Sequence, residues 1–171
     1  MMLGIVNGIK RASVLLAGLA LISCGFHLAG SGNLPVAMQS TYLDSSEQYS
    51  EFYGSLSEAL RRRGLNLVDS RDAAGAILRI SEDSSGQRIL SVSARNIPRE
   101  YEVFYSVTFA LEADGQALVE PENLVARRNY TYDETQVLGK EREETILRRA
   151  LAEDLARQVV RRIEAVTVAP L

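Results

Sequence analysis

The chain has one cysteine, Cys24, and one histidine, His27, and these side chains offer the clearest chemistry. A cysteine thiol can attack an electrophile or carry an acyl group, and a histidine imidazole can move a proton. His27 lies in a glycine-rich stretch, where no predicted element would hold it in place for catalysis. The sequence contains no HExxH, GxSxG or glycine-rich phosphate motif and no paired cysteines. We therefore expect no enzymatic activity, no metal and no cofactor.

Cys24 stands at the end of an apolar segment. A basic pair at residues 10–11 precedes an apolar run over residues 12–22, an order typical of a secretory signal peptide. The run is about half the ~20 residues that a membrane-spanning helix needs. It ends in Leu21-Ile22-Ser23-Cys24, which resembles the bacterial lipobox, in which the chain is cut before an acylated cysteine. We predict a cleaved signal peptide over residues 1–23 and a lipid anchor on Cys24; the alternative is a buried thiol in an uncleaved helix.

The composition excludes one class of partner. The signal segment holds two basic and no acidic residues, so its removal changes the formal net charge from −3 to −5. Proteins that bind nucleic acids usually show a basic surface. We therefore expect no nucleic-acid partner. Gly25, which follows the cysteine, favours the outer membrane, since an aspartate there tends to retain similar lipoproteins at the inner membrane.

Two cations are predicted to lie on loops. Arg95 ends a predicted strand, before Asn96-Ile97-Pro98, and Lys140 follows a glycine just before the last predicted helix. In an antiparallel sheet these loops could share one end of the domain, where the two side chains would suit an anionic headgroup. The arginine runs at 61–63 and 161–162 are more simply explained as helix ends.

The elements that must position these residues follow from hydrophobic periodicity. We expect a tether over residues 24–35 and a single α+β domain over 36–171, with two helices packed on one face of a mostly antiparallel, roughly four-stranded sheet.

Predicted strands cover 36–43, 100–111 and 124–133, and segments 76–80 and 88–94 form either a hairpin or one irregular strand. The first helix would begin at a capping box formed by Ser45 and Gln48 and end before Gly64. The second would begin near residue 141 and end near residue 166. Two acidic pairs, 82–83 and 133–134, fall in predicted turns.

Three segments together resemble a known family. They are Cys24-Gly25-Phe26-His27-Leu28, the stretch "ARNIPREYEVFYSVTFAL" at 94–111, and "YTYDETQVLGKEREE" at 130–144. With the order of elements, they are similar to the lipopolysaccharide-assembly lipoprotein family, LptE. The resemblance covers nearly the whole mature chain.

The resemblance implies a function and a set of partners. Members of that family are outer-membrane lipoproteins that plug the lumen of a large β-barrel, LptD, and help it to fold. The pair inserts lipopolysaccharide into the outer leaflet, and the lipoprotein itself binds lipopolysaccharide. By the local motifs, the two basic positions implicated in that binding fall on Arg95 and Lys140.

Two other functions remain open at this point. One is a scaffold lipoprotein of another envelope assembly machine, which would share the anchor and the α+β domain but would not bind lipopolysaccharide. The other is a periplasmic hydrolase, which would require a pocket with perturbed carboxylates.

Overall fold

The computed structural model describes residues 34–131 and 137–168. The predicted signal peptide, nearly all of the predicted tether and Cys24, the predicted lipid anchor, lie outside the described residues. The elements, in chain order, are η1 (Val36–Gln39), β1 (Ser40–Ser45), α2 (Glu51–Arg62), β2 (Asn66–Val68), η2 (Arg71–Ala73), β3 (Ala76–Val92), β4 (Pro98–Ala113), β5 (Gln116–Thr131) and α3 (Val137–Val168).

The strands form one mixed sheet in the order β2-β1-β3-β4-β5. β1 runs parallel to both of its neighbours, β2 and β3. β3, β4 and β5 form a long antiparallel meander. Asp114 and Gly115, both with positive φ, make the tight turn between β4 and β5, as an Asp-Gly pair favours.

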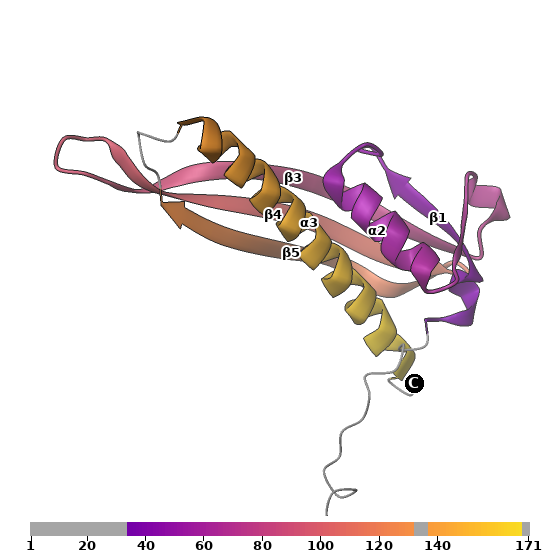
Figure 1. Ribbon diagram of the computed structural model, residues 1–171. Coiled ribbons are helices and arrows are strands. Elements are labelled where there is room, and N and C mark those ends of the chain that lie inside the picture. Colours follow the sequence, from indigo (N-terminus) through magenta and orange to yellow (C-terminus); the bar gives the residue numbers. More distant parts are fainter. Residues whose placement is uncertain (1–33, 132–136, 169–171) are drawn as a thin grey trace, which may run out of the picture. The chain divides into compact units, whose positions relative to one another are not determined.

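Helices α2 and α3 lie side by side on one face of this sheet (Figure 1). The alternating residues of β4 from Val103 to Leu111 point into the core beneath them, as their period of two predicts. α3 buries a stripe that includes Leu151, Leu155, Val159 and Ile163. The predicted α+β class with two helices on a sheet is confirmed.

The sheet differs from the prediction in strand number and direction. It has five strands and is mixed, not four-stranded and mostly antiparallel. The additional strand is the three-residue β2, which is too short to show a period of two in the sequence. Residues 36–39, predicted as the start of the first strand, form the 3-10 turn η1, and Thr41 Oγ1 donates a hydrogen bond to the Met38 carbonyl at the junction, 2.6 Å.

β3 is one continuous strand and not a hairpin. It runs from Ala76 to Val92 with irregularities at Ser81 and near Ile89, so the alternative of one irregular strand is confirmed and the turn predicted at the acidic pair 82–83 is wrong. Glu82 and Asp83 therefore lie within a strand. Glu82 accepts hydrogen bonds from Thr108 and Ser84 on the helix-free face of the sheet, and these and Ser106 lower its pKa.

α2 has a defined cap at each end. Its N-cap is Ser50, whose Oγ accepts a hydrogen bond from the Tyr53 amide at 2.9 Å, so the predicted cap at Ser45 lies too early in the chain. Gly64, with φ +83°, follows the last turn. Its amide bonds to the Arg61 carbonyl and the Leu65 amide to the Leu60 carbonyl, which is a Schellman motif.

Candidate functional site

The turn between β3 and β4 exposes Arg95 at its tip. The Asn96 amide bonds to the Ser93 carbonyl at 2.9 Å, and the Ser93 amide bonds to the Ile97 carbonyl at 2.7 Å. Asn96 takes φ +61°, which asparagine tolerates better than most residues. A β-turn followed by a left-handed residue closes a common three-residue hairpin loop. Arg95 therefore lies on an ordered tip and is exposed.

The start of α3 lies at the same end of the sheet. The register pairs Glu100, just after the turn, with Thr131 at the end of β5, and α3 begins six residues later (Figure 1). Lys140 lies in the first turn of α3 and not in a loop before it, because the helix begins at Val137, earlier than the sequence predicts. The structure thus brings the two predicted segments to one end, while the Lys140 side chain lies outside the described part.

The arginines without an acidic partner are unevenly distributed. Most of the described arginines form ion pairs with a carboxylate. Among the described residues, those that do not are Arg61, Arg95, Arg99, Arg142 and Arg161. Arg95, Arg99 and Arg142 all belong to the hairpin turn, the start of β4 or the start of α3. We call this region, with the position of Lys140, the hairpin end; among its described side chains, these three arginines form no ion pair with a carboxylate.

A paired cluster lies further along the same hairpin. Glu102 on β4 is only 8% exposed, and its Oε1 lies 2.7 Å from Arg88 Nη2 and 3.8 Å from Arg127 Nε. A carboxylate with so little access to water is stabilised by adjacent guanidinium groups. Two guanidinium groups flank one carboxylate here, so these three side chains together carry one net positive charge.

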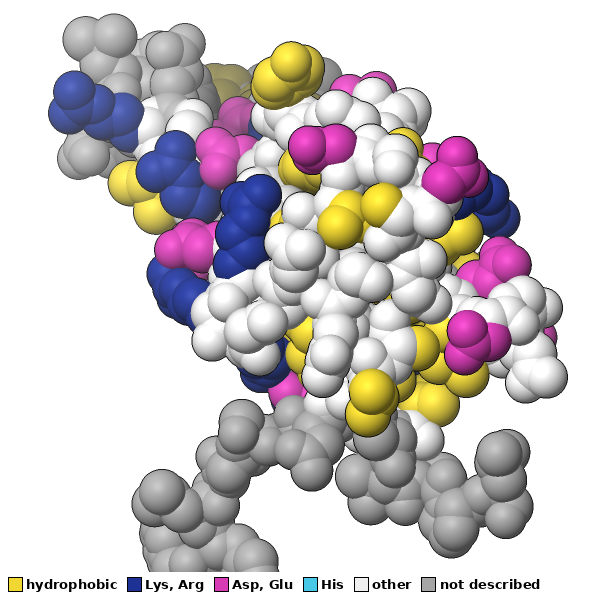
Figure 2. Space-filling model, turned by 90° about the vertical axis from the view of Figure 1, so that its right-hand side faces the viewer, with side chains coloured by type: hydrophobic (Ala, Val, Ile, Leu, Met, Phe, Trp, Pro, Cys, Tyr) yellow, Lys and Arg dark blue, Asp and Glu magenta, His cyan; other side chains and the backbone are white. Residues whose placement is uncertain are grey.

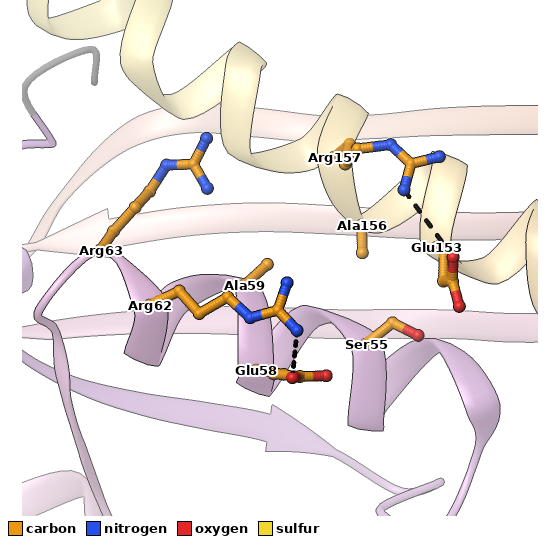
Figure 3. Close-up of a pocket in the computed structure, with 8 residues that line it drawn as sticks. All are labelled: Ser55, Glu58, Ala59, Arg62, Arg63, Glu153, Ala156 and Arg157. Carbon is orange, nitrogen blue, oxygen red and sulfur yellow. Dashed lines mark hydrogen bonds and ion pairs between the residues drawn. The ribbon is translucent and has the colours of Figure 1, made fainter. Parts of the chain in front are cut away.

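The hollow between α2 and α3 differs from the hairpin end because its arginines are paired with carboxylates (Figure 3). It has a volume of about 340 Å³, and three arginines reach it: Arg62, Arg63 and Arg157. Arg62 pairs with Glu58 and Arg157 with Glu153 and Asp154, while Arg63 Nε lies 2.7 Å from Glu164 Oε1. Because each guanidinium already has a carboxylate partner, this hollow is a neutralised helix seam and has little free charge to offer an anion.

The end of the domain at the right of Figure 1 carries side chains of both charges. In the view of that end in Figure 2, acidic and basic side chains occur together and apolar side chains form separate patches among polar atoms. Within the described residues, no helix is both long and apolar enough to cross a membrane.

Comparison with known proteins assigns the family. The sequence model of the LptE family, described as lipopolysaccharide-assembly, matches residues 38–163. This chain belongs to the LptE family. The LPS-assembly lipoprotein LptE of Pectobacterium atrosepticum is 27% identical over 157 residues, which cover 90% of this chain and 85% of that protein. The LptE of Yersinia enterocolitica is 28% identical over 167 residues, 94% of this chain and 79% of its own.

Solved structures of lipoproteins share the LptE fold seen here. Rare lipoprotein B from Shewanella oneidensis has a TM-score of 0.66 and 28% identity, and the match covers 75% of this chain and 96% of that one. A lipoprotein B from Nitrosomonas europaea has a TM-score of 0.71 and 25% identity, with coverage of 85% and 94%. The resemblance inferred from the sequence is therefore confirmed at the level of the family.

Sequence reasoning missed two cations of the hairpin end, Arg99 and Arg142. Arg99 follows Pro98 and was indistinguishable from an ordinary solvated loop residue. Arg142 lies among the acids 141, 143 and 144, so the sequence does not indicate whether it is paired. The signal that the sequence lacks is which arginines form an ion pair, which depends on the strand register and on where the helix starts.

Proposed function

We propose that this chain is an outer-membrane lipoprotein held at the periplasmic face by an acylated Cys24. Cleavage would remove residues 1–23, residues 24–35 would serve as the tether, and residues 36–171 would form the domain. Two acyl groups or more on one cysteine give stable anchoring where a single chain does not. The lipobox, the family and the lipoprotein relatives support this proposal.

The same proposal assigns lipopolysaccharide binding to Arg95 and Lys140. The observation that carries it is that Arg95, Arg99 and Arg142 of the hairpin end form no ion pair with a described carboxylate, at the end of the domain where the position of Lys140 also lies. Lipopolysaccharide bears phosphates and acidic sugars, which guanidinium and ammonium groups bind through charge-assisted hydrogen bonds. The hydrogen-bonded turn fixes the backbone at Arg95, so little backbone freedom would be lost on binding.

The third part of the proposal is a barrel partner of the LptD type. The lumen of a large membrane barrel is polar, so a domain that fills it needs a charged, folded surface. The ion pairs along α2 and α3 and the polar helix-free face of the sheet fit that setting. We propose that the domain plugs the barrel, assists its assembly and supports insertion of lipopolysaccharide into the outer leaflet, with no catalytic step of its own.

The binding proposal is tested with a charge-reversed pair. Full-length protein carrying Arg95→Glu and Lys140→Glu should bind labelled lipopolysaccharide at least about tenfold more weakly than the unchanged protein, because two charge-assisted contacts become repulsive. The matched control is Arg61→Glu with Arg161→Glu. It makes the same change in net charge at two other exposed arginines that lack a described acidic partner.

The outcomes separate the candidate functions. If only the variant of Arg95 and Lys140 loses lipopolysaccharide binding, and its melting temperature is unchanged, the result supports the binding site at these two residues. Equal loss in both variants would mean that binding follows net charge only and has no site. If the unchanged protein does not bind lipopolysaccharide, the scaffold function weighed from the sequence replaces this proposal.

A further inference from the structure

Three large apolar side chains are exposed together on the distal part of β3. Ile89 is 52% exposed, Leu90 43% and Val92 51%. In the described part of the chain, the other large hydrophobic residues with comparable exposure are scattered: Val36, Tyr49, Val125 and Ile146. Single exposed apolar residues are ordinary, whereas a contiguous group indicates a contact surface.

The exposure has a structural origin. Gln87 pairs with Val103, whose side chain is fully buried beneath the helices, but the next inward pair is Ile89 with Tyr101. The register then shifts between Ile89 and Ser91 and again before Val92, so the strand leaves regular pairing as it approaches the turn. In Figure 1 this part of the hairpin extends beyond α3. The core therefore ends at the stacked rings of Tyr101 and Tyr130, while the apolar sequence of β3 continues past them.

These residues lie close to two arginines of the hairpin end, Arg95 and Arg99, in the strand register and along the chain. Val92 pairs with Pro98, and Ser91 pairs with Glu100, which places Arg99 opposite the interval between Ser91 and Val92. Arg95 lies at the tip, three residues beyond Val92. One short hairpin thus presents an apolar strip and unpaired guanidinium groups together. That combination is complementary to an anionic amphiphile, whose phosphate and hydrocarbon are joined in one molecule.

We propose that Ile89, Leu90 and Val92 contact the acyl chains of the lipopolysaccharide molecule whose phosphates are held by the cations of the hairpin end. This inference rests on the proposed function and adds a second part to the ligand that is recognised. Burial of three apolar side chains against hydrocarbon gives a favourable free energy that a headgroup alone cannot supply.

The first test distinguishes binding of the acyl chains of lipopolysaccharide from binding of its headgroup. The probes are intact lipopolysaccharide and the same lipopolysaccharide with its acyl chains removed by alkali, each bound to full-length protein in nanodiscs. The triple variant Ile89→Ser, Leu90→Ser and Val92→Ser should bind the intact probe about tenfold more weakly and the deacylated probe as well as the unchanged protein does. The control replaces Val36, Tyr49 and Val125 by serine and should bind both probes normally.

The second test distinguishes a single lipid molecule from a bilayer surface. Lipopolysaccharide and phosphatidylglycerol, each with a photoreactive diazirine on an acyl chain, are compared in the same nanodiscs. We expect cross-links to residues 89–92 from labelled lipopolysaccharide, and several-fold fewer from labelled phosphatidylglycerol.

Each result has one meaning. Equal cross-linking by both lipids would overturn the inference and make the hairpin a membrane contact. Intact lipopolysaccharide bound normally by the triple serine variant would also overturn it, but would leave the binding proposal standing if the variant of Arg95 and Lys140 loses binding. If the unchanged protein binds neither probe, the proposed function itself fails.

Discussion

Asp83 is a carboxylate on the helix-facing side of β3 that connects two elements. It accepts hydrogen bonds from Ser50, the N-cap of α2, and from the hydroxyl of Tyr105 on β4 at 2.7 Å. The sequence places Asp83 in a turn, but in the structure it fixes the start of α2 on the sheet. A buried polar group with its partners in place stabilises a unique arrangement, and loss of one partner is costly.

The hydroxyl of Tyr105 predicts an alkaline instability. Burial raises the pKa of Tyr105, and the hydrogen bond and negative charge of Asp83 raise it further. Above about pH 10 the unfolded tyrosine loses its proton while the folded one keeps it, so the free energy of unfolding should fall as the pH rises. In urea unfolding at several pH values, the free energy of unfolding of Tyr105→Phe should fall less steeply with pH than that of the unchanged protein. Tyr49→Phe, at a fully exposed position, should retain the decline of the unchanged protein; identical slopes in all three proteins would contradict the account.

At the scale of the element, α2 offers a matched pair of glycines. Gly64 has φ +83° in the Schellman motif, whereas Gly54 lies inside the helix with no atom within 4 Å of an added Cβ. Gly64→Ala should lower the free energy of unfolding by about 1 kcal/mol because alanine is strained at positive φ. Gly54→Ala should raise it by about 0.5–1 kcal/mol because alanine favours the helix. Thermal or urea unfolding measures both, and equal signs for the two changes would contradict the cap described here.

The elements also show how far the sequence determines this fold. The long alternation in β4, the Asp114-Gly115 turn and the apolar stripe of α3 are local patterns, and the structure contains all three. β2 could not be predicted because three residues carry no period, and its position beside β1 depends on a distant pairing. The polar stretch around Glu82 reads as a turn, but it remains a strand because Thr108 and Ser106 on β4 satisfy its side chains across the sheet.

The candidate site was predictable only where it depends on local sequence. The sequence places Arg95 next to a turn-forming Asn96, and the hairpin confirms an exposed tip. The contributions of Arg99 and Arg142 depend on which acids lie near them in space, which a linear sequence does not give. The exposure of Ile89 likewise depends on where the helices end over the sheet.

At the scale of the whole molecule, the charge is divided between two regions. Along α2 and α3 most of the described arginines are paired with carboxylates, including Arg149 with Glu51 across the two helices and Arg63 with Glu164. Exposed pairs of this kind add little stability, but they keep the surface polar without a strong net field. At the hairpin end, Arg95, Arg99 and Arg142 form no ion pair with a described carboxylate. This division suits a domain that fills a polar lumen and binds an anionic lipid at one end.

The most direct test of the proposed function is the mass of the complex that the full-length protein forms. Tagged protein is extracted from membranes in mild detergent and weighed by light scattering or native mass spectrometry. We predict a one-to-one complex with an outer-membrane β-barrel several times the size of this chain, with Cys24→Ala reducing its recovery from membranes. Recovery of the protein alone, or with soluble companions only, would contradict the assignment to a barrel.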